Sequence, residues 1–216
     1  MPKKSDLELN YLPLTFICAT AVLLIGFFIL GFATDFGRSF TTESYRRHQI
    51  ARQPAEIPNL MLLNMQGGQE RLSDSIRKDG RFVLLDFFYT SCKTICIAQA
   101  SIFDSIQEKI KLKHLENKVR LISISFDPEH DDVEAIKKYS QKIAADKSVW
   151  NIYTLQNLND LDLLLDNFGI YVIKIPPFND LDHNASLHLI DPQGRLIQIS
   201  NLEDMDELFS IVSKRH

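Results

Sequence analysis

The sequence has few cysteines, no strong excess of one charge sign, and no repeated or low-complexity segment. Three cysteines in 216 residues are too few for a disulfide scaffold, so any close pair among them is expected to carry chemistry. The formal net charge is only -4, and the basic residues are scattered, which argues against a nucleic-acid surface. The composition, 45% hydrophobic and 24% charged, is that of a globular protein.

Charged residues are missing altogether from Leu12 to Ala33. As a helix this stretch is long enough to cross roughly 30 Å of hydrocarbon. A buried core helix is usually shorter and polar on one face, and a signal peptide has a shorter apolar core followed by small residues. Residues 32–36 make a poor cleavage site, so we predict a retained transmembrane helix. Cys18 lies within it and is interpreted as a packing or lipid-facing residue.

The anchor divides the chain into four predicted parts. Residues 1–11 precede the transmembrane helix 12–33, residues 34–58 form a charged tether with two prolines, and residues 59–216 form the folded domain. Lysines lie before the anchor and arginines after it, but long domains are translocated largely regardless of charge. The charge pattern therefore leaves the orientation open.

The folded domain alternates predicted strands and helices. The apolar run 82–88 predicts a strand in the buried middle of a sheet. Further strands are predicted at 60–63, 119–126, 150–155, 171–175, 187–190 and 196–200, and helices at 98–110, 133–143, 158–168 and 202–212. This order predicts an α/β fold with a central mixed sheet flanked by helices. A cysteine pair where the first buried strand meets its helix is the thioredoxin-fold position.

The pair is Cys92 and Cys96, in the stretch FFYTSCKTICIAQA. If a helix begins near Thr94, Cys92 lies at its N-terminus and Cys96 one turn inside, so both sulfurs can face one spot. The helix N-terminus and the neighbouring Lys93 both favour thiolates. Two such thiolates can form a disulfide or hold a soft metal, and residue types alone leave both open.

A third ligand would favour metal, and histidine is the candidate type. Most of the histidines are interpreted as solvated side chains, as is usual for this residue type outside a core: His48, His114, His130 and His216. His183 lies in a polar loop predicted to face the cysteine helix, whereas His188 falls in a strand. Cys92, Cys96 and His183 would suit copper, while zinc usually takes four protein ligands in structural sites. A plain redox pair remains the alternative.

Three segments together resemble the Sco/SenC family of membrane-anchored, thioredoxin-fold copper proteins. FVLLDFFYTSCKTIC resembles the family's apolar strand and CxxxC motif. ISISFDPEHDDVEAIKKY is similar to its DPxxD helix start, and DHNASLHLIDPQGRL to its Asp-His pair, strand and turn. A CxxxC motif alone would be weak evidence for the family, but the three motifs in this order are specific to it.

The resemblance implies copper binding by Cys92, Cys96 and His183, and no ligand role for His188. It also implies a role in assembling the CuA centre of cytochrome c oxidase. The sequence departs from the family's CPxxCP pattern at Lys93 and Ile97, where prolines are usual. His130 replaces an arginine of the DPxRD segment.

The function expected is a copper chaperone rather than an enzyme, with copper release linked to the dithiol–disulfide state. Expected partners are the oxidase subunit that carries CuA, other copper chaperones and thiol reductants, with no nucleic acid. The short N-terminus contains Asp6 and Glu8 and does not resemble a transit peptide. The resemblance implies a cytoplasmic N-terminus and a folded domain in the bacterial periplasm or the mitochondrial intermembrane space, and the composition of the N-terminus favours the bacterial inner membrane. The alternatives are a membrane-anchored thiol-disulfide oxidoreductase, in which Cys92 attacks and Cys96 resolves, and an interaction domain with inert cysteines.

Overall fold

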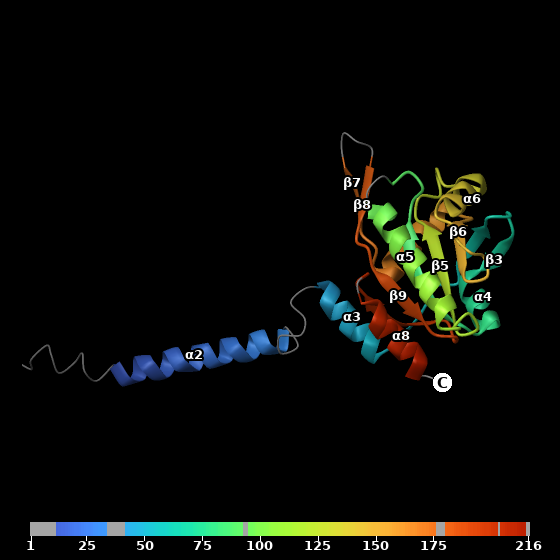
Figure 1. Cartoon of the computed structure of the whole chain (residues 1–216). Helices are drawn as coiled ribbons and strands as arrows, with labels where there is room; N and C mark the ends of the chain where they lie inside the picture. Colours follow the sequence, from blue (N-terminus) through green and yellow to red (C-terminus); the bar gives the residue numbers. More distant parts are fainter. Residues whose placement is uncertain (1–11, 34–41, 93–94, 176–179, 203, 215–216) are drawn as a thin grey trace, which may run out of the picture. The chain divides into compact units, whose positions relative to one another are not determined.

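The computed structural model describes residues 12–33, 42–92, 95–175, 180–202 and 204–214 (Figure 1). By its internal contacts the chain divides into two compact units, Met1–His48 and Gln49–His216. The predicted segment 1–11, the first part of the predicted tether, Lys93 and His216 lie outside the described residues, as does the side chain of Cys96.

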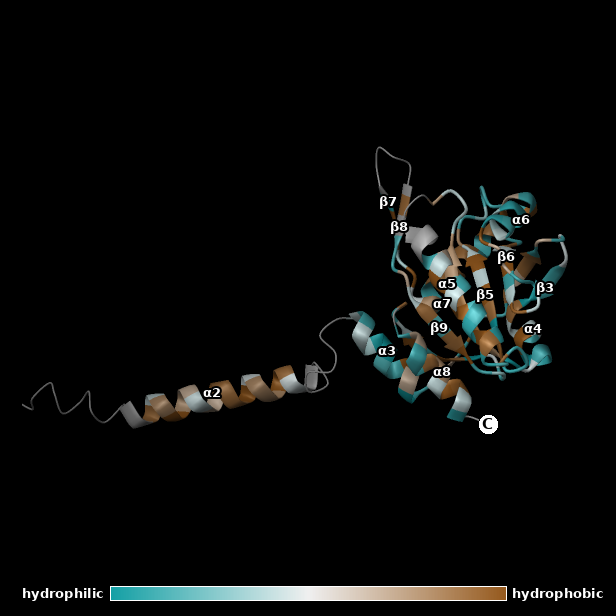
Figure 2. Cartoon of the chain, in the orientation of Figure 1, coloured by the Kyte–Doolittle hydropathy of each residue, from teal (hydrophilic) through white to brown (hydrophobic). Residues whose placement is uncertain are grey.

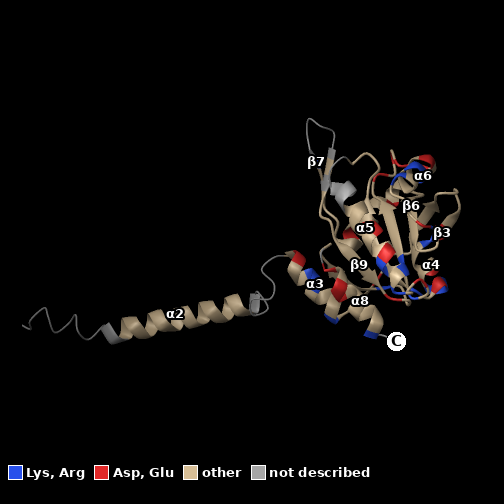
Figure 3. Ribbon diagram, viewed as in Figure 1, with Lys and Arg blue, Asp and Glu red and all other residues tan. Residues whose placement is uncertain are grey.

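Helix α2 (Leu12–Ala33) occupies the stretch predicted to cross a membrane. Its window Leu14–Gly31 has a mean hydropathy of 2.5 and none of it is buried within the protein. Figure 2 shows the helix as mostly apolar, and Figure 3 shows no charged residue along it. By length and composition, this is the one helix of the described chain that could cross a membrane.

Part of the predicted tether is helical. Helix α3 (Thr42–Arg52) contains no fully buried residue, although Ile50 is partly buried and packs against the hydrophobic core. A salt bridge one turn apart, with 2.9 Å between Arg47 Nε and Glu43 Oε1, supports the helix locally, as i,i+4 pairs do. The segment lacks an apolar period, which is why the sequence did not indicate a helix here.

The second unit is built on an eight-stranded sheet in the order β1-β10-β9-β4-β5-β6-β2-β3. These strands are β1 (Ala55–Glu56), β2 (Met61–Asn64), β3 (Gln69–Arg71), β4 (Phe82–Phe88), β5 (Val119–Ser125), β6 (Trp150–Leu155), β9 (Leu187–Ile190) and β10 (Arg195–Ser200). Strands β4, β5 and β6 run parallel, and β9 pairs antiparallel with β4. All seven residues of β4 are buried, as are all seven of β5, as expected for strands covered on both faces.

Helices cover both faces of this sheet. They are α4 (Leu72–Asp79), α5 (Ile95–Leu112), α6 (Val133–Lys142), α7 (Leu161–Phe168) and α8 (Met205–Lys214). Consecutive strand residues point to opposite faces. Phe88 stacks on Tyr139 of α6 with ring centroids 4.4 Å apart, and Phe87 packs against Phe168 of α7 at 5.1 Å. The two helices therefore lie on opposite faces, and the predicted mixed sheet flanked by helices is confirmed.

The structure differs from the sequence-based expectation in the segment around His183. Strand β7 (Val172–Ile175) pairs with β8 (Asp180–His183) in a separate two-stranded sheet, with Val172 opposite His183. The residues at 182 and 183 were expected in a loop, but they end a strand. Figure 1 shows this hairpin and the start of α5 at the same end of the main sheet.

Candidate metal centre

Cys92 lies in the short connection between β4 and α5, and Cys96 lies in the first turn of α5. Cys92 is partly buried and packs against the hydrophobic core. Its backbone N–H donates to the Tyr89 carbonyl across 3.4 Å, a weak bond that closes a turn just before the helix. The strand-to-helix junction predicted for the pair is confirmed.

The connection is fixed by the buried carboxylate of Asp131, which is 1% exposed. Its oxygens accept from the Thr90 N–H at 2.9 Å, the Thr90 hydroxyl at 2.5 Å and the Ser125 hydroxyl at 2.5 Å. Burial raises the pKa of Asp131, and these hydrogen bonds to its ionised form oppose that rise. Asp131 thus holds the residue two positions before Cys92 to the end of β5.

His183 is buried, with 6% of its surface exposed. The Phe126 ring meets it edge to face, with centroids 4.8 Å apart. His183 Nδ1 lies 3.3 Å from the Asn184 carbonyl oxygen. A carbonyl only accepts, so this contact favours a proton on Nδ1 and the lone pair on Nε2. A neutral imidazole held by a carbonyl at one nitrogen is the usual form of a metal-ligating histidine.

Tyr89 joins the cysteine segment to the histidine strand. Its hydroxyl donates to the Leu181 carbonyl at 2.9 Å and accepts from the Leu181 N–H at 3.2 Å. Tyr89 also packs on Phe126, with ring centroids 5.4 Å apart, and Phe126 packs on His183. Two segments distant in sequence, one ending in Cys92 and one ending in His183, are thereby held side by side.

Beneath the start of α5 lies a buried acid that the sequence analysis did not single out. Asp86, in β4, accepts from Gln99 Nε2 of α5 at 3.1 Å. Burial raises the pKa of Asp86 to about 7, although hydrogen bonds from Ser123 and Gln99 work against that rise. A carboxylate inside a continuous apolar strand was the available signal for it, whereas nothing in the sequence pointed to Tyr89.

Two other histidines have structural partners of their own. His188 donates from Nε2 to the Phe168 carbonyl at 3.0 Å and packs between Phe87 and Phe168. This places it on the face of the sheet that α7 covers. His130 is exposed and contacts Asp127 at 2.9 Å, which raises the pKa of His130 through a hydrogen bond to the carboxylate. Both fit the structural roles expected for them.

The donor types fit a soft metal, with two sulfurs from the cysteine segment and an imidazole from β8. Among the residues that the structure describes, no three His, Cys, Asp or Glu side chains are grouped to hold a metal ion. The Cys96 side chain lies outside that set, so the three-ligand site stays a prediction.

Comparison with known proteins identifies the family. The SCO1/SenC family model matches residues 54–214. The SCO1 protein homolog of Bacillus subtilis is 28% identical over 137 residues, which cover 63% of this chain and 69% of that protein. The structure of BsSco, a member of the Sco family of cytochrome c oxidase assembly proteins with a disulfide switch, has a TM-score of 0.63 and 26% identity. The match covers 74% of this chain and 93% of BsSco.

A more distant neighbour is Arabidopsis thaliana ScoI, solved with copper bound. It has a TM-score of 0.61 and 18% identity, and the match covers 75% of this chain and 100% of that one. At this identity the likeness shows the fold alone. The predicted thioredoxin-like fold is confirmed by these neighbours, and the family match extends over most of the folded unit and both cysteines and His183. The chain belongs to the SCO1/SenC family.

Proposed function

We propose that this protein binds copper through Cys92, Cys96 and His183 and supplies it to the CuA centre of cytochrome c oxidase. The observation that carries the proposal is the Tyr89 contact, because it brings the strand that ends at His183 beside the segment that contains Cys92. Family membership and the copper-bound structure of a relative support it. Two thiolates select a soft ion, so Cu(I) is the form expected to bind most tightly.

The two cysteines also make the site sensitive to oxidation. A Cys92–Cys96 disulfide forms with the loss of two electrons and two protons, and it leaves no thiolate to act as a ligand. Oxidation of the pair would therefore remove two of the three donors, which couples copper release to the thiol state. The disulfide switch of BsSco supports this part of the proposal.

The test is a titration of the full chain in detergent micelles with Cu(I), in competition with a chromophoric chelator. A Cys18→Ser background leaves Cys92 and Cys96 as the only thiols. His183→Ala removes one of three ligands and should weaken binding by more than about 100-fold, since even outer-shell partners are worth 10–100-fold. His130→Ala is the matched control, because that imidazole is exposed and pairs with Asp127. Equal affinity of His183→Ala and His130→Ala would refute the three-ligand site.

A specific observation also supports a second function. Cys92 is partly exposed at the start of a helix, which suits the attacking thiol of a thiol-disulfide oxidoreductase, with Cys96 resolving. In that function His183 is not a ligand. Turnover of a protein disulfide by the metal-free, reduced chain, at the same rate in wild type and His183→Ala, would favour it over copper delivery.

We also propose that α2 anchors the protein in a bacterial inner membrane, with the folded unit in the periplasm. Its partners there would be the oxidase subunit that carries CuA, a copper donor and a thiol reductant. A membrane-impermeant maleimide added to spheroplasts should label Cys92 if this orientation is right. Protection of Cys92 until the membrane is lysed would place the domain on the cytoplasmic side.

A further inference from the structure

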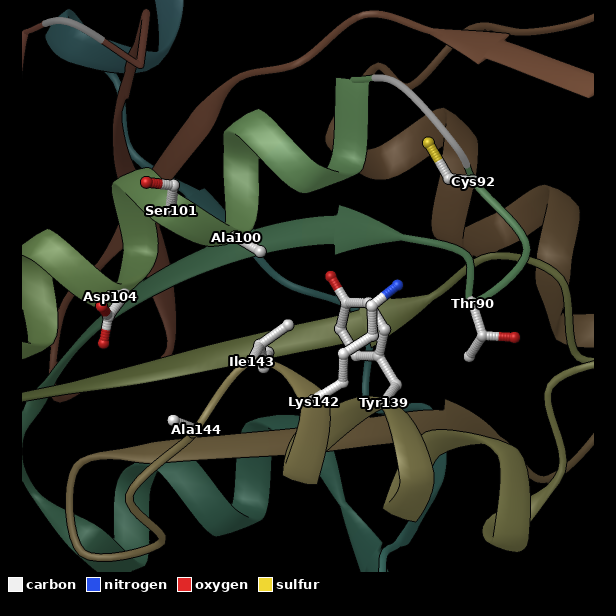
Figure 4. A pocket seen from close by; sticks show the side chains of 9 residues that line it. All are labelled: Thr90, Cys92, Ala100, Ser101, Asp104, Tyr139, Lys142, Ile143 and Ala144. Atoms are coloured by element: carbon white, nitrogen blue, oxygen red, sulfur yellow. The ribbon is translucent and has the colours of Figure 1, made fainter.

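A groove opens beside Cys92, between α5 and α6. Its first part is a cavity of about 350 Å³ that begins at Thr90 and Cys92. Figure 4 shows Ala100 of α5 on one wall, and Tyr139 and Lys142 projecting from α6 toward α5. Cys92 and Asp104 stand at opposite ends of the view, with Lys142 between them. Cys92 thus lies at one end of a groove whose walls carry both apolar and polar side chains.

The groove continues beyond this cavity. A second depression of about 490 Å³ shares Thr90, Tyr139 and Lys142 with the first and runs on along the start of α6, where it is lined by His130, Asp132, Glu134, Ala135 and Lys138. Both acidic residues there have partners, because Glu134 lies beside Lys138 and Asp132 accepts from the Ala135 N–H. Together the two parts extend along α6 rather than forming a single closed chamber. A small thiol compound would fill one part, whereas an extended peptide, with about 3.3 Å between successive residues, can occupy both.

Lys142 lies where the two parts meet. Among the described residues no acidic side chain pairs with it, in contrast to Lys138, which lies 3.9 Å from Glu134 Oε1. Asp104, the acidic residue of the first cavity, accepts from Gln107 Nε2 at 3.2 Å. The groove therefore offers a cation to its occupant close to Cys92, and a carboxylate is the complementary group.

The geometry points to the groove as the docking site for an extended segment of a partner protein that carries its own cysteine. The partner's sulfur would lie at Cys92, an apolar side chain against Tyr139 and Ile143, and a carboxylate at Lys142. This inference rests on the proposed function, because it assigns the partner of the same cysteine pair. It does not involve His183 or the binding of copper itself.

The test measures how the reduced full chain, in micelles and in a Cys18→Ser background, reacts with activated peptides. Each blocked peptide carries one cysteine as a mixed disulfide with thionitrobenzoate, a leucine, and either glutamate or lysine two residues from the cysteine. The Cys92 thiolate attacks the peptide sulfur, the new disulfide forms, and the yellow thionitrobenzoate anion leaves with the electron pair of the broken bond. The rate of colour formation is the readout, divided by the rate with a small neutral aromatic disulfide.

Wild type should react about fivefold faster with the glutamate peptide than with the lysine peptide, as expected for an exposed ion pair near its upper limit. Lys142→Glu should reverse that preference. Lys137→Glu is the matched control, because Lys137 is on the same helix, pairs with Glu134 at 3.7 Å and does not line the groove. It should keep the wild-type preference.

A second variant tests occupancy of the groove rather than charge. Ser101 is exposed and lines the first cavity, so Ser101→Trp fills it without removing core contacts. The variant should slow both peptides and leave the small disulfide unaffected. The inference is overturned if Lys142→Glu and Lys137→Glu show the same peptide preference, or if Ser101→Trp slows neither peptide.

The two proposals fail separately. If copper binding requires His183 but the rate of peptide exchange does not depend on Lys142, the docking proposal is wrong and the proposed metal site is unaffected. If the peptides show the predicted preference but His183→Ala binds copper normally, the metal site is wrong and the groove serves thiol exchange alone.

Discussion

The most informative single perturbation is Asp86→Asn, which removes the buried ionisable group between β4 and α5. Asp86 Oδ1 and Gln99 Oε1 are both buried acceptors without a hydrogen-bond partner in the described part of the chain. The asparagine keeps an oxygen to accept from Gln99 Nε2, and its own amide nitrogen supplies a donor in place of one unpartnered oxygen. The fold should therefore tolerate the change.

The size of the effect follows from the pKa of Asp86, raised by burial from 3.8 to about 7. Between these two pH values the unfolded chain has lost a proton that the folded chain keeps. The free energy of unfolding then falls as pH rises, by about 1.4 kcal/mol per pH unit. Over the whole window this amounts to about 4 kcal/mol. Asp86→Asn lacks this loss. The free energy of unfolding of the variant should therefore equal that of wild type near pH 4 and be larger than that of wild type above pH 7.

The assay is equilibrium unfolding of the full chain in micelles by guanidinium chloride, from about pH 4 to about pH 8. The single tryptophan, Trp150, reports it, because its indole is buried and donates to Ser123 Oγ at 2.9 Å. The difference in free energy of unfolding between variant and wild type reports the titration of Asp86 alone, because the other titrating groups are the same in both proteins. Parallel curves for the two proteins across this range would show that the pKa of Asp86 is not raised.

Asp146→Asn provides a control of opposite sign. Hydrogen bonds from Ser148 and the nearby Lys111 lower the pKa of Asp146 to about 2. Its stabilisation is present above the ordinary value of 3.8 and is lost as pH falls toward 2. The side chain is 41% exposed, so solvent screening limits the effect to below about 1 kcal/mol. This variant should be slightly less stable than wild type at neutral pH, and the gap should close on acidification.

Two further predictions concern the contacts that position the predicted ligands. Tyr89→Phe removes both hydrogen bonds to β8, which should lower stability by about 1–2 kcal/mol. It should also weaken Cu(I) binding about tenfold through His183, measured by chelator competition, while maleimide labelling of Cys92 stays unchanged. Asp131→Ala leaves the Thr90 N–H without its acceptor and should lower the free energy of unfolding by about 3 kcal/mol. In this variant labelling of Cys92 should become faster, and an unchanged labelling rate would show that Asp131 does not hold the connection.

The core strands and the larger helices could be predicted because burial on two faces leaves a clear pattern. β4 is apolar except for Asp86, and β5 alternates apolar and polar residues toward its end. Helix α6 begins where Asp132 caps it, its carboxylate accepting from the Ala135 N–H at 2.8 Å. Helix α4 was not predicted. It spans eight residues, and its N-cap residue, Arg71, makes no side-chain cap hydrogen bond, so the usual start signal is missing.

The candidate site could be predicted only in part. The position of Cys92 at a strand-to-helix junction follows from element order, and that was confirmed. The contact between Tyr89 and Leu181 could not be predicted. The two residues are 92 positions apart, and the Tyr89 hydroxyl bonds the backbone of Leu181 and not its side chain. Strand β8 has the polar sequence DLDH, and a hairpin outside the main sheet does not need the apolar alternation by which strands are recognised.

The separate β7–β8 sheet makes the three predicted ligands unequal in how easily they can be given up. A two-stranded sheet is only marginally stable by itself, and this one carries His183 at its end. Local opening of the hairpin would break the Tyr89 hydrogen bonds and the Phe126 contact, while all eight strands of the main sheet stay paired. If copper is bound as proposed, the His183 imidazole would then leave the ion before the two cysteine sulfurs do. A stepwise handover of this kind needs no unfolding of the domain, and amide hydrogen exchange in β8 faster than in β4 would be its signature.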